Sequence, residues 1–318
     1  MSSIPMIRQS AGAGAARNAE RRLNRPGRPG RNNNTRRNDG GGRGRGGAVR
    51  RPGVLTYGTL TAVVLASLFP LYWSFLVGSH DSTALSRGIP LLPGGNFLAN
   101  AAKVFDSIPF WKAMGNSILV SSVTAASVVV FSTLAGFAFA KLRFRGNKAL
   151  LVFVIATMAV PTQLGVVPLF IVMAKLGWTG SLWAVIIPGL VTAFGVFWMT
   201  QYLRDALPDE LIEAVRMDGA SMIQAFWYVG FPAARPAAAM LALFTFVATW
   251  TNFFWPFIVL DPSNPTLPVA LQLLQAAHFV DYSVVLAGAV LATVPLLLLF
   301  MAAGRQLVSG IMQGAVKG

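Results

Sequence analysis

Residues 116–146 read NSILVSSVTAASVVVFSTLAGFAFAKLRFRG, and no charged side chain occurs among them before Lys141. The charge-free segment extends over 114–140, which exceeds the roughly 20 residues that a helix needs to cross a membrane. Barrel strands are much shorter than this, and only helices or closed barrels satisfy the backbone in lipid. The stretch therefore predicts a transmembrane helix, and with it an all-α integral membrane protein.

The rest of the chain repeats this pattern. Of its 318 residues, 54% are hydrophobic and only 12% are charged, about half the share usual in soluble domains. Prolines lie inside every predicted span except the second, and we expect them to kink the helices. The sequence predicts a six-span domain over 54–318. The six charge-free segments are 54–78, 114–140, 149–174, 182–203, 237–260 and 282–304.

Several classes of site are disfavoured by composition. The chain has no cysteine, which excludes a disulfide framework and any thiolate nucleophile or ligand. Its two histidines, His80 and His278, are far apart in the sequence. We therefore expect no metal site, no cofactor and no catalytic residue. No signal peptide is expected either, because no apolar stretch follows the early basic residues until Val54.

Residues 1–53 differ from the rest in composition. They hold thirteen arginines and carry +11 of the net charge of +15, with almost no large apolar side chain. Such a segment cannot bury enough surface to offset its ordering entropy, so we expect a disordered tail. The bias favours contact with anionic lipid headgroups. The stretch GGGRGRGGAVRR at 40–51 also resembles an Arg-Gly tract that binds RNA, but we regard nucleic acid as the weaker alternative.

The distribution of basic residues predicts the orientation in a bacterial plasma membrane. With the N-terminus in the cytoplasm, 22 lysines and arginines lie inside and four lie outside. Both termini are therefore predicted to be cytoplasmic, with a long outside loop at 79–112 and a long inside loop at 204–236. The four outside residues are Arg87, Lys103, Lys112 and Lys175.

The inside loop begins with a predicted short helix. Residues 203–236 read LRDALPDELIEAVRMDGASMIQAFWYVGFPAARP. Pro208 suits the start of a helix, because its ring replaces a backbone donor that has no partner there. Gly219 stands where this helix must stop, since glycine tolerates the left-handed conformation of a C-terminal cap. A sharp turn is therefore expected at Gly219.

A second short helix is predicted directly after that turn. Ser221 and Gln224 have the spacing of a capping box, in which each side chain bonds to the other residue's backbone N–H. Pro232 and Pro236 are expected to end this helix before the fifth span.

The first of these helices is acidic. Asp209 and Glu213 lie four residues apart on one face, and Arg216 is the one basic residue among the acids. An acidic helix at the cytoplasmic side would fit a basic groove on another protein. A solvated loop that merely reverses the chain direction is the alternative. The acidic residues are Asp209, Glu210, Glu213 and Asp218.

The spacing in this loop resembles that of a known family. EAV at 213–215, Gly219 six residues after Glu213, and Val229 before FP at 231–232 resemble the EAA loop of ABC importer permeases. DGAS at 218–221 is typical of the sugar branch. Further stretches are similar to the maltose-type second permease subunit. They are 116–146, VPTQLGVVPLFIVMAKLGW at 160–178, TWTNFFWPFIV at 249–259 and GAVKG at 314–318.

The resemblance implies a type I ABC importer permease fold and a set of contacts in the loop. In this family the EAA loop is a coupling helix that docks into a cytoplasmic ATPase subunit. Glu213 would be the acidic contact, Ala214 a close-packing position and Gly219 the turn. Pro232 would mark the return to the membrane. Asp218 and Ala220 belong to the same coupling set, and Lys317 is a further contact candidate.

The resemblance also implies partners. We expect a second permease subunit, forming a heterodimer, two ATPase subunits and an extracytoplasmic sugar-binding protein. The residue types in the predicted spans also indicate that the energy for transport comes from outside the chain. No predicted span holds an Asp, Glu or His that could take a coupling proton, and the chain has no phosphate-binding Gly-rich loop with Lys-Ser/Thr. The alternatives are a self-sufficient facilitator, a sodium-coupled transporter with a backbone-carbonyl site, or an ABC permease for amino acids or peptides.

The fifth span contains a candidate substrate pathway. Residues 249–256 read TWTNFFWP, a mixture of hydroxyl, amide and aromatic groups that suits a carbohydrate. Trp250 and Trp255 could stack on sugar rings, and Asn252 is expected near mid-span, where an amide is costly without a partner. Interhelical packing around a proline kink is the equally weighted alternative.

Overall fold

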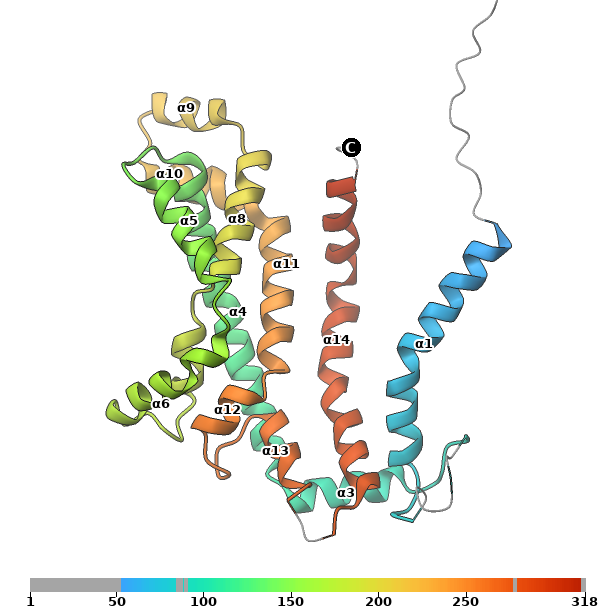
Figure 1. Ribbon diagram of the computed structural model, residues 1–318. Helices are drawn as coiled ribbons and strands as arrows, with labels where there is room; N and C mark the ends of the chain where they lie inside the picture. Colours follow the sequence, from blue (N-terminus) through green and yellow to red (C-terminus); the bar gives the residue numbers. More distant parts are fainter. Residues whose placement is uncertain (1–52, 84–87, 89–90, 277–278, 316–318) are drawn as a thin grey trace, which may run out of the picture. The chain divides into compact units, whose positions relative to one another are not determined.

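The computed structural model describes residues 53–83, 88, 91–276 and 279–315, and the side-chain surroundings as far as residue 304. Every regular element in these ranges is helical (Figure 1). The arginine-rich tail and Lys317 lie outside them. The elements are α1 Val54–Gly78, α3 Phe97–Ser107, α4 Phe110–Lys141, α5 Asn147–Thr157, η1 Thr162–Gly165, α6 Val166–Lys175, α7 Trp183–Ile186, η2 Ile187–Gly189, α8 Ala193–Ala206, α9 Asp209–Met217, α10 Met222–Ala225, η3 Phe226–Gly230, α11 Phe231–Trp250, α12 Phe254–Val259, α13 Leu267–Leu273 and α14 Tyr282–Ala315.

The predicted membrane spans are found. In the described part of the chain, five helices are long and apolar enough to cross a membrane: Val54–Gly78, Phe110–Lys141, Trp183–Ala206, Met222–Trp250 and Tyr282–Gly304. The third predicted span is a broken pair, Asn147–Thr157 and Thr162–Lys175, bent by 88°. Pro161 stands at the break, where it removes a backbone donor and prevents a continuous helix. With this pair counted as one span, the number is six.

The fifth span is displaced from its predicted position of 237–260. The apolar helix runs over Met222–Trp250, passes through a π turn at η3 and ends at Trp250. The expectation that Pro232 and Pro236 end the preceding helix is therefore wrong. Pro232 lies in the first turn after the π turn, where a missing N–H costs little, and Pro236 is accommodated inside α11.

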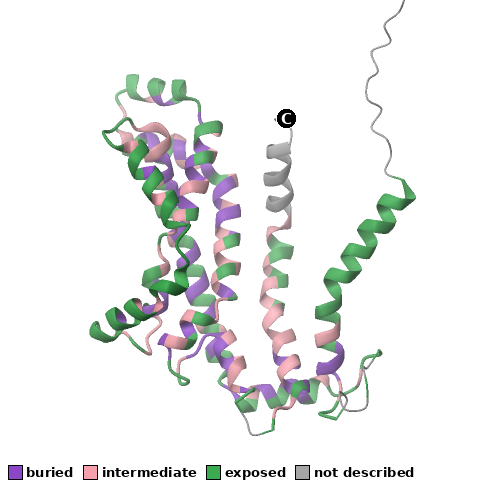
Figure 2. Ribbon diagram, in the orientation of Figure 1, coloured by how far each residue is buried: buried purple, intermediate pink, exposed green. Residues whose placement is uncertain are grey.

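Three helices form the packed centre of the bundle. Helices α4, α8 and α11 lie side by side, and their buried side chains form one cluster (Figures 1 and 2). Small residues allow α4 and α8 to approach closely. A Cβ added at Gly136 would lie 2.7 Å from the Cβ of Met199, and one at Gly195 would overlap Ser132 Oγ. Phe137, Leu203 and Leu241 complete the close packing of the cluster.

The buried part of helix α1 is its C-terminal end. Leu76, Val77 and Gly78 are its buried residues, and most of the helix before them is exposed (Figure 2). A Cβ added at Gly78 would lie 2.9 Å from the backbone nitrogen of Ala287 in α14. The absence of a side chain at Gly78 therefore permits this close contact.

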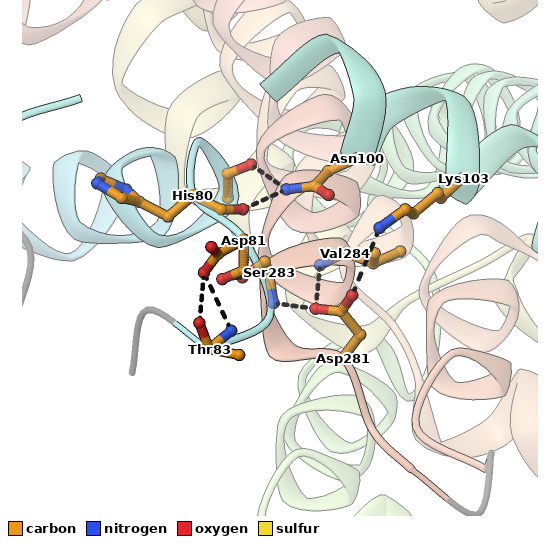
Figure 3. Close-up of polar contacts among 9 residues, drawn as sticks. His80, Asp81, Thr83, Asn100, Lys103, Asp281, Ser283 and Val284 are labelled. Carbon is orange, nitrogen blue, oxygen red and sulfur yellow. Dashed lines mark hydrogen bonds and ion pairs between the residues drawn. The ribbon is translucent and has the colours of Figure 1, made fainter. Parts of the chain in front are cut away.

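A network of polar contacts, which we call the α3 junction, holds the end of α1 against α3 and the start of α14 (Figure 3). Asn100, 2% exposed, donates from Nδ2 to the carbonyl oxygens of Gly78 (2.9 Å) and His80 (2.7 Å). Ser283 donates from Oγ to the carbonyl of Asp81 (2.9 Å). Asp281 accepts bonds from the first backbone N–H groups of α14 and lies 3.8 Å from Lys103 Nζ. The α3 junction consists of Gly78, His80, Asp81, Asn100, Lys103, Asp281, Ser283 and Val284.

Candidate functional site

The loop between α8 and α11 forms a helical hairpin, α9 and α10, which we call the coupling hairpin. Helix α9 ends at Met217, and Gly219 follows with a φ of +81°, as its position predicted. The N–H of Ala220 donates to the carbonyl of Val215 (3.2 Å), a bond typical of a helix that ends in a left-handed glycine. The hairpin therefore depends on a backbone conformation that glycine adopts without strain.

The start of α10 is fixed by the predicted capping box. Ser221 N donates to Gln224 Oε1 (2.7 Å), and Gln224 N donates to Ser221 Oγ (3.3 Å). These two bonds satisfy backbone donors that have no partner within the helix. The geometry of the hairpin is thus set by its own sequence, through Gly219 and this box.

Two side chains attach α9 to the bundle. Ile212 is 6% exposed and packs in the cluster of α4, α8 and α11. Lys141, the last residue of α4, places its Nζ 2.7 Å from Oδ1 of Asp209, the first residue of α9. The Lys141 side chain is only 5% exposed, whereas that of Asp209 is 66% exposed. The hydrogen bond from Lys141, together with its charge, lowers the pKa of the Asp209 carboxyl, and Arg143 adds a smaller effect.

The predicted coupling residues are mostly exposed. Glu213, Ala214, Asp218 and Gly219 are exposed, while Ala220 is half-buried. Pro232 is half-buried and lies at the start of α11. The residues from Glu213 to Ala220 lie along α9 and the turn that follows it, whereas Pro232 lies beyond α10 and Lys317 lies outside the described residues.

Large apolar side chains are exposed among these acids, a feature that the sequence analysis missed. Met217 is 88% exposed, Tyr228 77% and Ile223 70%. In the sequence these three residues stand among acidic and small residues, and that pattern could have predicted their exposure. A solvated helix rarely places large apolar groups outward without a partner. An acidic, partly apolar surface of this kind fits another protein better than it fits water.

A cavity of about 450 Å³ lies between the end of α4 and the coupling hairpin. Its charged lining combines Lys141, Arg143 and Arg216 with Asp209 and Glu213. In the sequence, Lys141 and Arg143 indicated only the orientation in the membrane, as part of the basic residues on one side. Their proximity to α9 could not be read from the sequence, because 68 positions separate Lys141 from Asp209.

The candidate substrate-pathway residues are not brought together. Trp250 is 3% exposed and stacks on Phe246, with ring centroids 5.8 Å apart. Trp255 packs against a different buried cluster and donates from Nε1 to the carbonyl of Ala184 (3.0 Å). Asn252 is half-buried in the break between α11 and α12. Asn252 therefore does not lie inside a continuous helix, as the predicted span over 237–260 implied, because α11 ends at Trp250.

The chain is similar in sequence to known transport proteins. Residues 128–313 match the family model described as "Binding-protein-dependent transport system inner membrane component". The chain is 33% identical over 261 residues to the arabinooligosaccharides transport system permease protein AraQ of Halalkalibacterium halodurans, covering 80% of this chain and 93% of the relative. It is 30% identical to the lactose transport system permease protein LacG of Rhizobium radiobacter, covering 84% of this chain and 97% of the relative.

A solved structure shares the fold. A chain from a bacterial ABC transporter involved in the import of the acidic polysaccharide alginate matches with a TM-score of 0.68 and 23% sequence identity. The match covers 79% of this chain and 95% of that chain. The helical arrangement described above is therefore one already known in a membrane-embedded importer.

Proposed function

Because this chain belongs to the family of binding-protein-dependent transport system inner membrane components, we propose that it forms half of the translocation pathway of an ATP-driven sugar importer. It is a multi-pass membrane protein with the fold of an ABC importer permease. The named relatives that carry arabinooligosaccharides and lactose support a sugar or oligosaccharide as the substrate. ATP hydrolysis is supplied by separate subunits.

The coupling hairpin carries this proposal. Its glycine turn and capping box give a rigid, self-determined shape, and its exposed face mixes acids with large apolar groups. Such a face suits a groove on an ATPase subunit that has basic and apolar lining. In this assignment Glu213 makes the charged contact, and Ala214 and Ala220 allow close approach. Asp218 and Gly219 shape the turn, and Pro232 begins the return to the membrane.

The remaining assembly follows from this role. The coupling hairpin and both termini lie in the cytoplasm, as the excess of basic residues on that side indicates. A second permease subunit completes the pathway, and an extracytoplasmic binding protein delivers the sugar. ATP binding closes the two ATPase subunits, which move the coupling hairpins. The translocation pathway between the two permease subunits then changes from inward- to outward-facing. Lys317 is a further ATPase contact in this proposal.

The sugar pathway is assigned to the break between α11 and α12. Asn252 is our candidate for a hydrogen bond to a sugar hydroxyl, because a break in a membrane helix leaves polar groups that a ligand can satisfy. Trp250 and Trp255 bound this break on its two sides, and both pack against neighbouring helices. Their role is to hold the break open.

The test replaces Glu213 by Lys. Reversing the charge places like charges against the basic groove, which costs several kcal/mol, so uptake is expected to fall by more than about tenfold. The amount of chain inserted in the membrane should not change, because Glu213 is exposed. The measurements are sugar uptake in vesicles and co-purification of the ATPase subunit.

Glu210→Lys is the matched control, because Glu210 is also exposed on α9 but lies outside the coupling set. It is expected to retain most of the uptake. Normal uptake by Glu213→Lys would contradict the assignment of the contact. Uptake by the purified chain in vesicles that contain no ATPase would instead favour a facilitator.

A further inference from the structure

Helix α4 is connected to the coupling hairpin at one end by a charged contact. Lys141 is its last residue, and its ammonium lies 2.7 Å from the carboxylate of Asp209. The side chain of Lys141 is 5% exposed, whereas that of Asp209 is 66% exposed, so the lysine is held in place while its partner remains in contact with water. Because Asp209 is the first residue of α9, the ion pair connects the start of the coupling hairpin directly to the end of α4.

The opposite end of α4 contacts a second segment, residues 263–267, which leads from α12 into the first residue of α13. Lys112 donates to the carbonyl of Ser263 (2.8 Å), and Ser117 Oγ accepts a bond from the N–H of Leu267 (2.7 Å). Asn116 donates to Asn264 Oδ1 (3.0 Å) and to the carbonyl of Pro265 (2.9 Å). Three residues in the first two turns of α4 thus attach this segment to the helix.

Between these two attachments α4 is continuous. It runs without interruption over 32 residues, which corresponds to about 48 Å at 1.5 Å per residue. It is the one predicted span that contains no proline, and it packs closely on α8 through Gly136. Helices bend sharply chiefly at proline, at π turns or where the backbone ladder is interrupted. A displacement at one end of α4 is therefore transmitted to the other with little loss.

We propose that α4 acts as a rigid rod that carries the movement of the coupling hairpin to residues 263–267, with Lys141 as the positioning residue that joins rod and hairpin. This inference rests on the proposed docking of an ATPase to the hairpin. Residues 263–267 lie at the end of the bundle opposite the hairpin, the side from which the sugar is delivered in our assignment. The position of residues 263–267, which face the incoming substrate, thereby depends on the nucleotide state of the ATPase.

The experiment uses the complete transporter reconstituted in vesicles. The chain has no cysteine, so Ser263→Cys gives this subunit a single attachment site for a spin label. Ser263 is exposed, and only its backbone carbonyl receives the bond from Lys112, so the label leaves that contact in place. In the otherwise unchanged transporter, the mobility of the label should differ between the nucleotide-free and ATP-bound states.

Two variants break the connection at Lys141. Lys141→Met removes the charge and keeps the length of the side chain, and Asp209→Asn removes the partner at an exposed position that should not affect folding. Each is expected to leave ATPase co-purification unchanged, to reduce the response of the label to ATP, and to lower uptake per ATP hydrolysed by about two- to fivefold. Combining Lys141→Asp with Asp209→Lys should restore part of the uptake.

Lys148→Met is the matched control, since Lys148 is exposed and lies in the same basic stretch after α4. It should behave as the unchanged protein does. If the response of the label to ATP is not reduced and uptake per ATP is unchanged in both Lys141→Met and Asp209→Asn, the inference is overturned. Loss of ATPase binding in these variants would also overturn it, because the pair would then serve docking. If the unchanged chain binds no ATPase, the proposed function itself fails.

Discussion

The α3 junction and the coupling hairpin are held in opposite ways. At the α3 junction, buried Asn100 bonds to two backbone carbonyls, and further bonds join α1, α3 and α14. The coupling hairpin meets the bundle through apolar contacts of buried Ile212 and Ala225, and through one ion pair whose carboxylate is largely exposed. The first region is held by buried hydrogen bonds. The second is held by apolar packing and one polar contact that water reaches, and its turn at Gly219 is exposed.

The two kinds of contact differ in energy. A buried backbone carbonyl that loses its hydrogen bond costs about 1–3 kcal/mol, because water cannot replace the partner. An ion pair with one exposed member contributes roughly 0–1 kcal/mol, since water and salt screen it. The comparison therefore predicts that damage at the α3 junction lowers stability, whereas damage at the coupling hairpin lowers transport and leaves stability nearly unchanged.

The largest effect is expected from Asn100→Ala. The substitution leaves the carbonyls of Gly78 and His80 without their donor, so the free energy of unfolding should fall by about 1–3 kcal/mol for each unsatisfied group. This fall in the free energy of unfolding is measured by thermal unfolding of the protein in detergent. Lys103→Met serves as the control, because its contact with Asp281 is long, at 3.8 Å, and Lys103 is 58% exposed. Equal effects of the two variants would contradict the distinction between buried and exposed contacts.

An intermediate effect is expected from Gly219→Val at the coupling hairpin. No atom lies within 4 Å of a Cβ added there, so the cost is that of the positive φ, about 1–3 kcal/mol. It should distort the turn between α9 and α10 and reduce uptake severalfold, while the thermal unfolding of the bundle stays within about 0.5 kcal/mol of the original.

Gly219→Asn provides the matched variant, since asparagine tolerates the left-handed region better than other residues do. It should retain more uptake than Gly219→Val. A marked loss of thermal stability in either variant would show that the hairpin is part of the stable core, contrary to the comparison.

The smallest effect concerns pH. Because Lys141 lowers the pKa of Asp209 in the folded protein, the ion pair contributes stability above the ordinary pKa of an aspartate. This contribution is lost as the pH falls through the lowered folded value. The protection of the amides in residues 209–217, measured as their exchange relative to the intrinsic rate at each pH, should therefore fall at acidic pH. This fall should be absent in Asp209→Asn. An identical pH profile in the two proteins would show that the pair does not hold α9.

Local chemistry explains what the sequence could predict. The six spans follow from apolar length, and the α9–α10 turn follows from Gly219 and the Ser221–Gln224 box, because all these signals lie within a few neighbouring residues. The Lys141–Asp209 pair was not predictable, since it depends on how α4 and α8 pack. The break after Trp250 had a local signal in Pro256, whose ring cannot donate a hydrogen bond to the carbonyl of Asn252. The burial of Trp250 had none, because it depends on packing against other helices.

The attachment of α1 has a consequence for how the protein is made. Gly78 closes against Ala287, which lies in the last helix of the chain. At roughly 5–20 residues per second, the roughly 200 residues between them take about ten to forty seconds to synthesise. During this interval α1 lies in the bilayer without α14, with only the α3 segment made early enough to contact its end, and its apolar surface on all sides suits it to do so. The contact between Gly78 and Ala287 is thus among the last that can form as the chain is synthesised.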